Sequence, residues 1–139
     1  DKAMKFAYGD IEDDDAIYEL GEGWVAEETW AIALYAAVRH IDSVEEAIIA
    51  AVNHDGDSDS TGAVCGNIMG AIYGYDHIAE RNLFCPEGRT LADTLEQSDL
   101  ILTVADDIAL AGVISRGDVC SRVLVDRWCK RYGSEFEGE

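Results

Sequence analysis

Glycine recurs at every fourth position after residue 61, at Gly62, Gly66, Gly70 and Gly74. Because an α-helix has about 3.6 residues per turn, these glycines would share one face of a helix. Glycine costs up to about 1 kcal/mol relative to alanine inside a helix, so four in one register predict a compensating close contact between backbones. The spacing therefore predicts a helix packed tightly against a neighbour along its glycine face.

The apolar pattern elsewhere is also helical. The residues from Ala26 to Arg39 are apolar around most of the helix circumference, which is typical of a central helix. Ser43 and Glu46 have the spacing of a capping box, in which the serine covers one exposed amide and the glutamate another. This box predicts a second helix that runs through Val52 to the acidic motif described below.

The carboxyl-terminal third predicts a connection and then three further helices. His77 to Gly88 is polar and contains Pro86, which indicates a connection. Helices are predicted at Thr90–Gln97, at Ser98–Ala111 with Asp106 and Asp107 opposite its apolar side, and at Cys120–Tyr132 with exposed Arg122, Arg127, Lys130 and Arg131. No segment has the alternation of a strand. The predicted fold is all-α, a compact orthogonal bundle forming a single domain over residues 1–139.

Charge and cysteine content exclude several classes of protein. The chain carries 29 acidic and 10 basic residues, a net charge of −19, and such a field repels the phosphates of nucleic acid. No apolar run is long enough to span a membrane and no leader opens the chain, so we expect a cytoplasmic protein without a membrane partner. The cysteines lack the spacing of a zinc site and are predicted to be reduced and mostly buried: Cys65, Cys85, Cys120 and Cys129.

An acidic motif precedes the glycine-rich helix. Asp55, Asp57 and Asp59 alternate with glycine and hydroxyl residues, and hard divalent cations prefer such oxygen ligands. An EF-hand loop is excluded because its sixth and twelfth positions, which need glycine and glutamate, hold Ser60 and Gly66. By spacing alone, a cap and turn between two helices explains the motif as well as a metal site does.

Several segments together resemble one family. The Gly-Asp-Ser-Asp-Ser core with the glycine-rich helix behind it is the specific part of the resemblance. These segments are similar to the carboxyl-terminal half of the ADP-ribosylglycohydrolase family: Leu20–Glu28, Ala47–Asn53, Gly56–Ala63, Gly70–Gly74 and Leu95–Ile101.

The resemblance implies a helical domain that holds two Mg²⁺ or Mn²⁺ ions and cleaves the bond between ADP-ribose and an acceptor such as a protein side chain. It implies that Asp57 and Asp59 are catalytic and that both bind metal together with Ser60. Asp55 stands where the family more often has glycine, so it is expected behind the metal ligands, near them but not in contact with the ions. The turn before Trp24 corresponds to a segment that approaches the bound ligand, but Trp24 itself is predicted to be a core anchor.

The amino-terminal part departs from the family pattern. The family's Gly-Asp-rich first segment and its Thr-Asp-Asp motif, which supply the other metal ligands, have no counterpart. Asp13–Asp15 lacks the threonine and is predicted to be a solvated loop. One hypothesis is therefore a hydrolase segment that acts on an ADP-ribosylated protein or an ADP-ribose-like small molecule. It would be either a fragment of a longer enzyme or a half completed by a complementary chain. The alternative is a non-catalytic ADP-ribose- or metal-binding protein or a structural, crystallin-like relative. Either could self-associate through exposed apolar helix faces.

Overall fold

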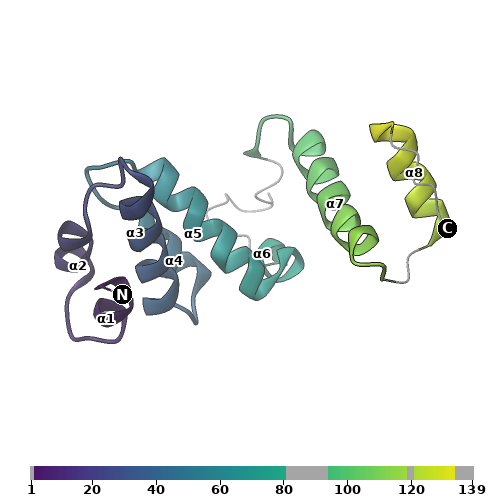
Figure 1. The fold of residues 1–139 in the computed structure, drawn as a ribbon. Coiled ribbons are helices and arrows are strands. Elements are labelled where there is room, and N and C mark those ends of the chain that lie inside the picture. The colour runs from purple at the N-terminus through teal and green to yellow at the C-terminus, as the bar shows by residue number, and fades with distance from the viewer. Residues whose placement is uncertain (1, 81–93, 119–120, 134–139) are drawn as a thin grey trace. The chain divides into compact units, whose positions relative to one another are not determined.

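The protein was analysed as a computed structural model, which describes residues 2–80, 94–118 and 121–133. Eight helices lie within these ranges, and no strand is found there (Figure 1). The all-α prediction is therefore confirmed. By its contacts the chain divides into two compact units, Asp1–Leu91 and Ala92–Glu139. The expectation of a single domain over residues 1–139 stays a prediction.

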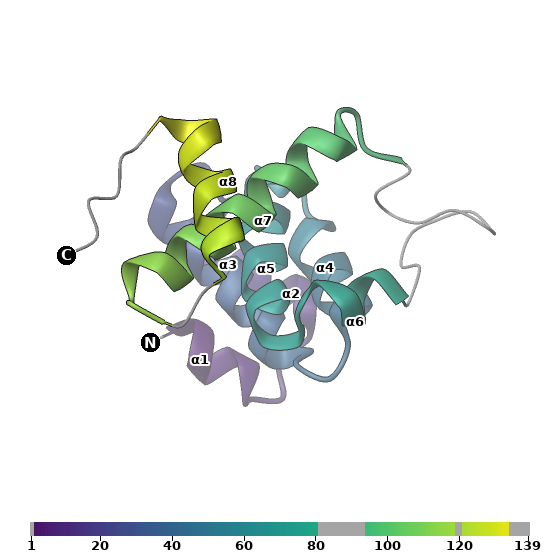
Figure 2. The ribbon, with the colours of Figure 1, turned by 90° about the vertical axis from the view of Figure 1, so that its right-hand side faces the viewer.

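Helix α3 (Ala26–Arg39) is the central helix of the first unit, as its apolar pattern predicts. It packs against α1 (Lys2–Ala7), α2 (Asp13–Leu20), α4 (Val44–Val52) and α5 (Ser58–Tyr73) (Figures 1 and 2). Its buried side chains are Ile32, Ala33, Tyr35, Ala36 and Ala37. Small residues at three of these five positions let the neighbouring helices approach the α3 backbone closely.

The glycine face of α5 is packed tightly at only one position. A Cβ atom at Gly62 would lie 2.5 Å from Val52 Cγ1, whereas one at Gly66 would make an ordinary contact of 3.8 Å with Ile48 Cδ1. A Cβ at Gly70 would meet nothing within 4 Å, and Gly74 is not helical but ends α5 with a φ of +78°. The predicted close contact along the whole glycine face is therefore wrong, although α4 runs beside α5, with Ile48 next to Gly66 and the Cys65 thiol donating to the Ala47 carbonyl.

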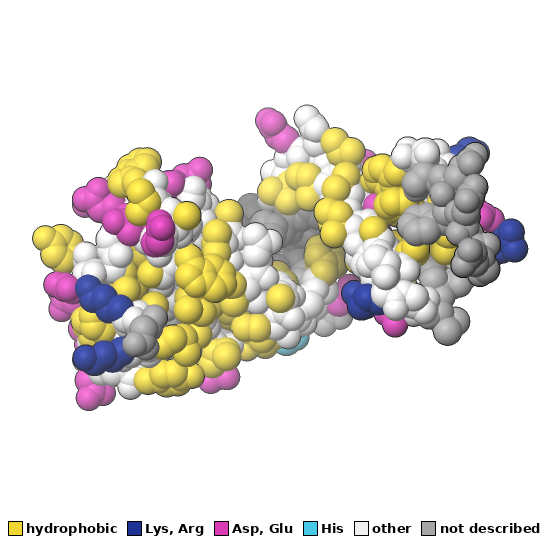
Figure 3. Space-filling model, in the orientation of Figure 1, with side chains coloured by type: hydrophobic (Ala, Val, Ile, Leu, Met, Phe, Trp, Pro, Cys, Tyr) yellow, Lys and Arg dark blue, Asp and Glu magenta, His cyan; other side chains and the backbone are white. Residues whose placement is uncertain are grey.

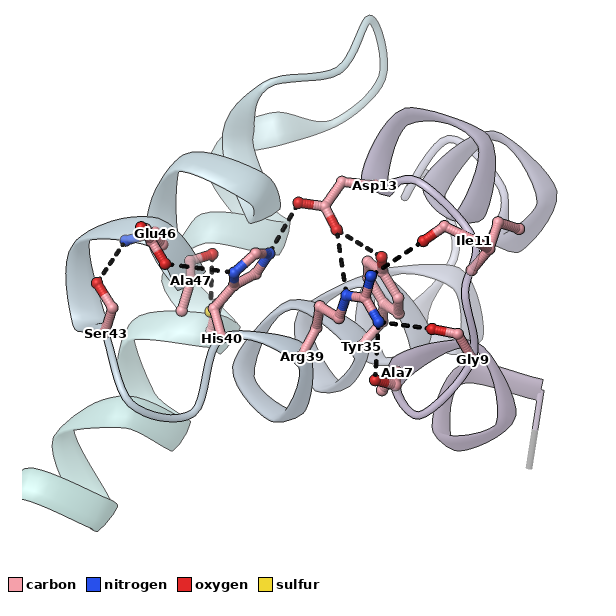
Figure 4. A network of polar contacts seen from close by, with 11 residues as sticks. Ala7, Gly9, Ile11, Asp13, Tyr35, Arg39, His40, Ser43, Glu46 and Ala47 are labelled. Atoms are coloured by element: carbon pink, nitrogen blue, oxygen red, sulfur yellow. Dashed lines mark hydrogen bonds and ion pairs between the residues drawn. The ribbon is translucent and has the colours of Figure 1, made fainter.

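The amino-terminal segment is helical and carries a polar network (Figure 4). Asp13 accepts a hydrogen bond of 2.6 Å from the Tyr35 hydroxyl and lies 2.7 Å from His40 Nε2. Arg39 donates to the carbonyl oxygens of Ala7, Gly9 and Ile11 and so holds the connection between α1 and α2. Burial and the bond to Asp13 raise the pKa of Tyr35.

The prediction of a solvated loop at Asp13–Asp15 is therefore wrong. These three acids form the first turn of α2, where carboxylates are favoured by the helix dipole. Their sequence did not reveal this because the partners of Asp13 lie 22 or more residues away, on α3 and just after it.

Half of the predicted capping box forms at the start of α4. Ser43 Oγ accepts a hydrogen bond of 3.3 Å from the Glu46 amide, as predicted. The Glu46 carboxylate does not return to Ser43, whose amide donates instead to the His40 carbonyl at 2.9 Å. Glu46 Oε2 instead lies 3.7 Å from His40 Nδ1.

The second unit contains α7 (Ser98–Ser115) and α8 (Arg122–Tyr132), which pack against each other (Figure 2). Asp107 was expected on the exposed side of its helix, but it is buried. It accepts hydrogen bonds from Arg131 and from the Tyr132 hydroxyl, while Trp128 Nε1 donates to its backbone carbonyl. The predicted helix from Ser98 is confirmed. Its Asp107 side faces α8 and not solvent, because Arg131 of α8 supplies a charged partner. Several apolar residues of the same helix are exposed: Leu100, Ile101, Val104 and Ile108.

The remaining predictions have mixed outcomes. Part of the predicted connection is helix α6 (Tyr75–Glu80), and the rest lies outside the described residues. The first half of the predicted helix Thr90–Gln97 lies outside them, and residues 94–97 form a turn and not an α-helix. Cys65 is buried and unpaired, and its burial raises the pKa of its thiol to about 11. Cys129 is unpaired and half-buried, while Cys85 and Cys120 lie outside the described residues.

The surface carries many acidic side chains, as expected from the 29 acidic and 10 basic residues of the chain. On the face of the first unit seen in Figure 3, acidic side chains lie mainly around the edge and hydrophobic side chains occupy the middle. Trp30 belongs to the exposed hydrophobic residues, with 54% of its surface accessible. Among the described residues, no helix is both long and apolar enough to cross a membrane.

Candidate metal and ligand site

The acidic motif spans the loop between α4 and α5 and the first turn of α5. Asp57 is the N-cap of α5, and its Oδ1 accepts a hydrogen bond of 3.4 Å from the Ser60 amide. Asp59 and Ser60 lie in the first turn, where the positive end of the helix dipole stabilises carboxylates. The local sequence explains this geometry, since aspartate is a favoured N-cap.

Asp57, Asp59 and Ser60 lie together at this helix start. The Ser60 hydroxyl, and after it hydrogen bonding with the Asp59 carboxyl, hold the pKa of Asp57 below its ordinary value. Within the described ranges, neither carboxylate is paired with a basic side chain. The three residues therefore gather carboxyl and hydroxyl oxygens at one helix start, and such a donor set fits a hard divalent cation.

The donor set is small. Within the part of the chain that the structure describes, no three histidine, cysteine, aspartate or glutamate side chains gather as a metal-binding group. Mg²⁺ prefers six oxygen ligands, so two carboxylates and one hydroxyl would need further oxygens from water or another polypeptide. The roles of Asp57 and Asp59 in catalysis, and of these two residues with Ser60 in metal binding, stay predictions.

A buried network behind the loop involves two residues to which the sequence pattern assigned no role in the site. The buried Thr61 hydroxyl donates to the Ala51 carbonyl at 2.7 Å and lies 3.0 Å from His54 Nε2. His54 Nδ1 accepts a hydrogen bond of 3.1 Å from the Gly56 amide. His54 and Thr61 thus tie the end of α4 to the start of α5 and give the loop one conformation. Their spacing offered no signal, because the network depends on how two helices meet.

The turn before α3 lies directly against the acidic loop. The Glu22 carbonyl accepts a hydrogen bond of 2.7 Å from the Asp57 amide. A Cβ atom at Gly56 would lie 1.8 Å from the Glu22 carbonyl oxygen, so only glycine allows this approach. Trp24 is 66% exposed and its Nε1 donates to Glu22 Oε2, which shows that the predicted role as a core anchor is wrong. The turn is held without the indole ring, by the backbone bond to Asp57 and by the Glu28 and Thr29 side chains.

Two hollows flank the loop. A cleft of about 350 Å³ is lined by the exposed Asp55 and by Asp14, Tyr18, Glu22 and His54, among others. Among the described residues, no hydrogen bond or ion pair involves the Asp55 side chain, and its place behind the metal ligands stays a prediction. On the other side, a shallower hollow of about 470 Å³ brings Ser60 near Trp30 and is otherwise lined by Ala26, Thr29, Ala63 and Val64.

Comparisons with known proteins agree with the resemblance seen in the sequence. The family model described as ADP-ribosylglycohydrolase matches residues 1–117. The human protein ADP-ribosylhydrolase ARH3 is 30% identical over 95 residues, a match that covers 61% of this chain and 26% of the relative. The chain thus spans about a quarter of the length of this curated relative. No solved structure matches it. Because the family match covers most of the chain, from α1 to the end of α7, the protein belongs to the ADP-ribosylglycohydrolase family.

Proposed function

We propose that the chain contributes one part of a metal-dependent site that hydrolyses the bond between ADP-ribose and an acceptor side chain. The observation that carries this proposal is the position of Asp57, Asp59 and Ser60 at one helix start in a member of the ADP-ribosylglycohydrolase family. The family relative named above is an ADP-ribosylhydrolase by name, which supports the reaction class.

The residues of this chain would hold Mg²⁺ or Mn²⁺ through hard oxygens. Asp57 and Asp59 would supply carboxylates, and Ser60 a neutral hydroxyl. The low pKa of Asp57 keeps that carboxylate ionised and available as a ligand at neutral pH. When bound, two divalent ions supply the polarisation that activates a water or the ribose hydroxyls near the anomeric carbon.

The remaining ligands would come from further residues of a longer enzyme or from a complementary chain. The described residues of this chain offer no third acidic, histidine or cysteine ligand at this place. We therefore propose turnover only in the completed site, with an ADP-ribosylated protein or an ADP-ribose-like small molecule as substrate. The net charge of −19 argues against nucleic acid as a partner. We also propose that the protein is cytoplasmic. Self-association is the other way in which further ligands could be brought to the site.

Calorimetric titration with Mn²⁺ tests the metal site in the 139-residue chain. Weak binding is expected for the wild type, and Asp57→Asn or Asp59→Asn should weaken it by about tenfold or more, because each replaces a charged ligand. Asp42→Asn is the matched control, since it removes the same charge from an exposed aspartate outside the acidic loop and should change the affinity little. A wild type that binds no Mn²⁺, or equal effects of all three variants, would overturn the assignment.

Release of ADP-ribose from a modified arginine or serine peptide tests the reaction. The chain alone should be inactive with Mn²⁺ or Mg²⁺ present, and activity should depend on Asp57 and Asp59 once a complementary family segment is added. Turnover by the isolated chain would contradict the incomplete site. Retained Mn²⁺ binding without turnover in the completed assembly would favour the alternative, a non-catalytic ADP-ribose- or metal-binding relative or a structural protein.

A further inference from the structure

The turn Gly21–Gly23 is held on one side by a single carboxylate. Glu28 Oε2 accepts hydrogen bonds from the amides of Glu22, at 3.2 Å, and Gly23, at 3.1 Å. Gly21 has a φ of +125°, and a Cβ atom there would lie 2.5 Å from the carboxyl carbon of Glu28. Gly21 therefore leaves room for the Glu28 side chain, which reaches back from the first turn of α3 to the turn before it.

The other side of the same turn contacts the acidic loop. The Glu22 carbonyl accepts the bond from the Asp57 amide, and Gly56 permits the approach, as described above. Gly23 is buried, and a Cβ atom there would lie 3.0 Å from Thr61 Cγ2 and 3.4 Å from the Asp57 carbonyl oxygen. Asp57 is thus fixed by a peptide unit whose own amide is held by Glu28.

The Glu28 carboxylate can hold a metal ligand in place without itself touching the metal. One oxygen of its carboxylate accepts both amide bonds, and bonds to a charged acceptor are stronger than bonds between neutral groups. The neighbouring Thr29 hydroxyl donates to the Gly23 carbonyl at 2.7 Å. Gly23 is thus held through both its amide and its carbonyl. Without Glu28, two amides of the turn lose their acceptor and the support of Asp57 is weakened.

We propose that Glu28 is a positioning residue that acts through the Glu22–Gly23 turn to fix Asp57, and that it thereby sets the affinity of the acidic loop for a divalent cation. The second part of this inference rests on the proposed function, whereas the first part does not. Groups that orient a metal ligand from behind typically change metal affinity by about 10- to 100-fold when they are removed.

Three variants separate geometry from charge. Glu28→Ala removes the acceptor, whereas Glu28→Gln removes the charge but keeps an amide oxygen that can accept both bonds. Glu27→Ala is the matched control, because Glu27 is an exposed acid in the same helical turn. Each variant is made in the full chain, and amide hydrogen exchange is measured without metal before titration with Mn²⁺.

Glu28→Ala should speed exchange of the Asp57 amide by about tenfold or more, because local opening then costs less free energy. It should weaken Mn²⁺ binding by about 10- to 100-fold. Glu28→Gln should restore most of both quantities, and Glu27→Ala should change neither. These results would support the inference, since a purely structural role would also speed exchange in the core of α3.

Unchanged exchange at Asp57 in Glu28→Ala would overturn the positioning role, whatever the metal data show. An equal loss of Mn²⁺ affinity in Glu28→Ala, Glu28→Gln and Glu27→Ala would also overturn it, because charge and not geometry would then be responsible. If the wild type binds no Mn²⁺, the proposed function fails, while faster exchange at Asp57 would still support the link from Glu28 to Asp57.

Discussion

The glycine face of α5 allows a direct comparison of two alanine substitutions in one helix. In Gly70→Ala the added Cβ meets nothing within 4 Å, whereas in Gly62→Ala it would lie 2.5 Å from Val52 Cγ1. Both substitutions gain the same stability from helix propensity, since alanine is favoured over glycine inside a helix by about 0.5–1 kcal/mol. Only Gly62→Ala carries a steric cost.

The size of that cost follows from the neighbour. Val52 is the last residue of α4, and a β-branched side chain in a helix has one strongly preferred rotamer, so Val52 cannot simply turn away. Overpacking of this kind costs about 1–3 kcal/mol. The gain from helix propensity is the same in both variants. The unfolding free energy of Gly70→Ala should therefore be higher than that of Gly62→Ala by about 1–3 kcal/mol.

Thermal and urea unfolding of the two variants beside the wild type measure this difference. In a unit of 91 residues, about 1 kcal/mol corresponds to a shift in Tm of about 4–8 °C. Gly70→Ala should raise the Tm and Gly62→Ala should lower it or leave it near the wild-type value. Equal stabilisation by both variants would refute the close contact between α4 and α5 at Gly62, and destabilisation by Gly70→Ala would refute the open space at Gly70.

Two further predictions concern buried polar groups. Burial alone would raise the pKa of Asp107, but hydrogen bonds from Arg131 and Tyr132 outweigh it and hold the pKa below the ordinary value. Asp107 should therefore stabilise the α7–α8 pair fully above the unfolded pKa of about 3.9, and this contribution should be lost as the pH falls through the folded pKa. The Trp128 indole resonance followed against pH would measure it, and Asp107→Asn should remove the acid dependence; an identical acid transition in that variant would contradict the assignment. Thr61→Val should lower the unfolding free energy by about 1–3 kcal/mol, because the Ala51 carbonyl and His54 lose a buried partner, and urea unfolding that matches the wild type would argue against the network.

Local chemistry in the sequence was sufficient for many elements. The apolar pattern of residues 26–39 predicted α3 with its correct bounds, and Ser43 acts as the predicted N-cap of α4. Gly21 and Gly23 adopt positive φ angles in the predicted turn. The motif Asp57–Ser60 and the glycine helix behind it also indicated the family, since their acids, hydroxyls and glycines lie within a short stretch of chain.

The tertiary structure alone decided which faces and partners these elements use. Asp13 and Asp107 were assigned to solvent, but partners distant in sequence hold them. Trp24 was assigned to the core, yet it is exposed beside a turn that packs against the acidic loop. Caps and helical periods depend on neighbours within about four residues, whereas burial and ion pairing depend on where helices cross. For that reason the sequence determined the helices and the acidic motif, and only the crossing of α3, α4 and α5 determined what supports Asp57.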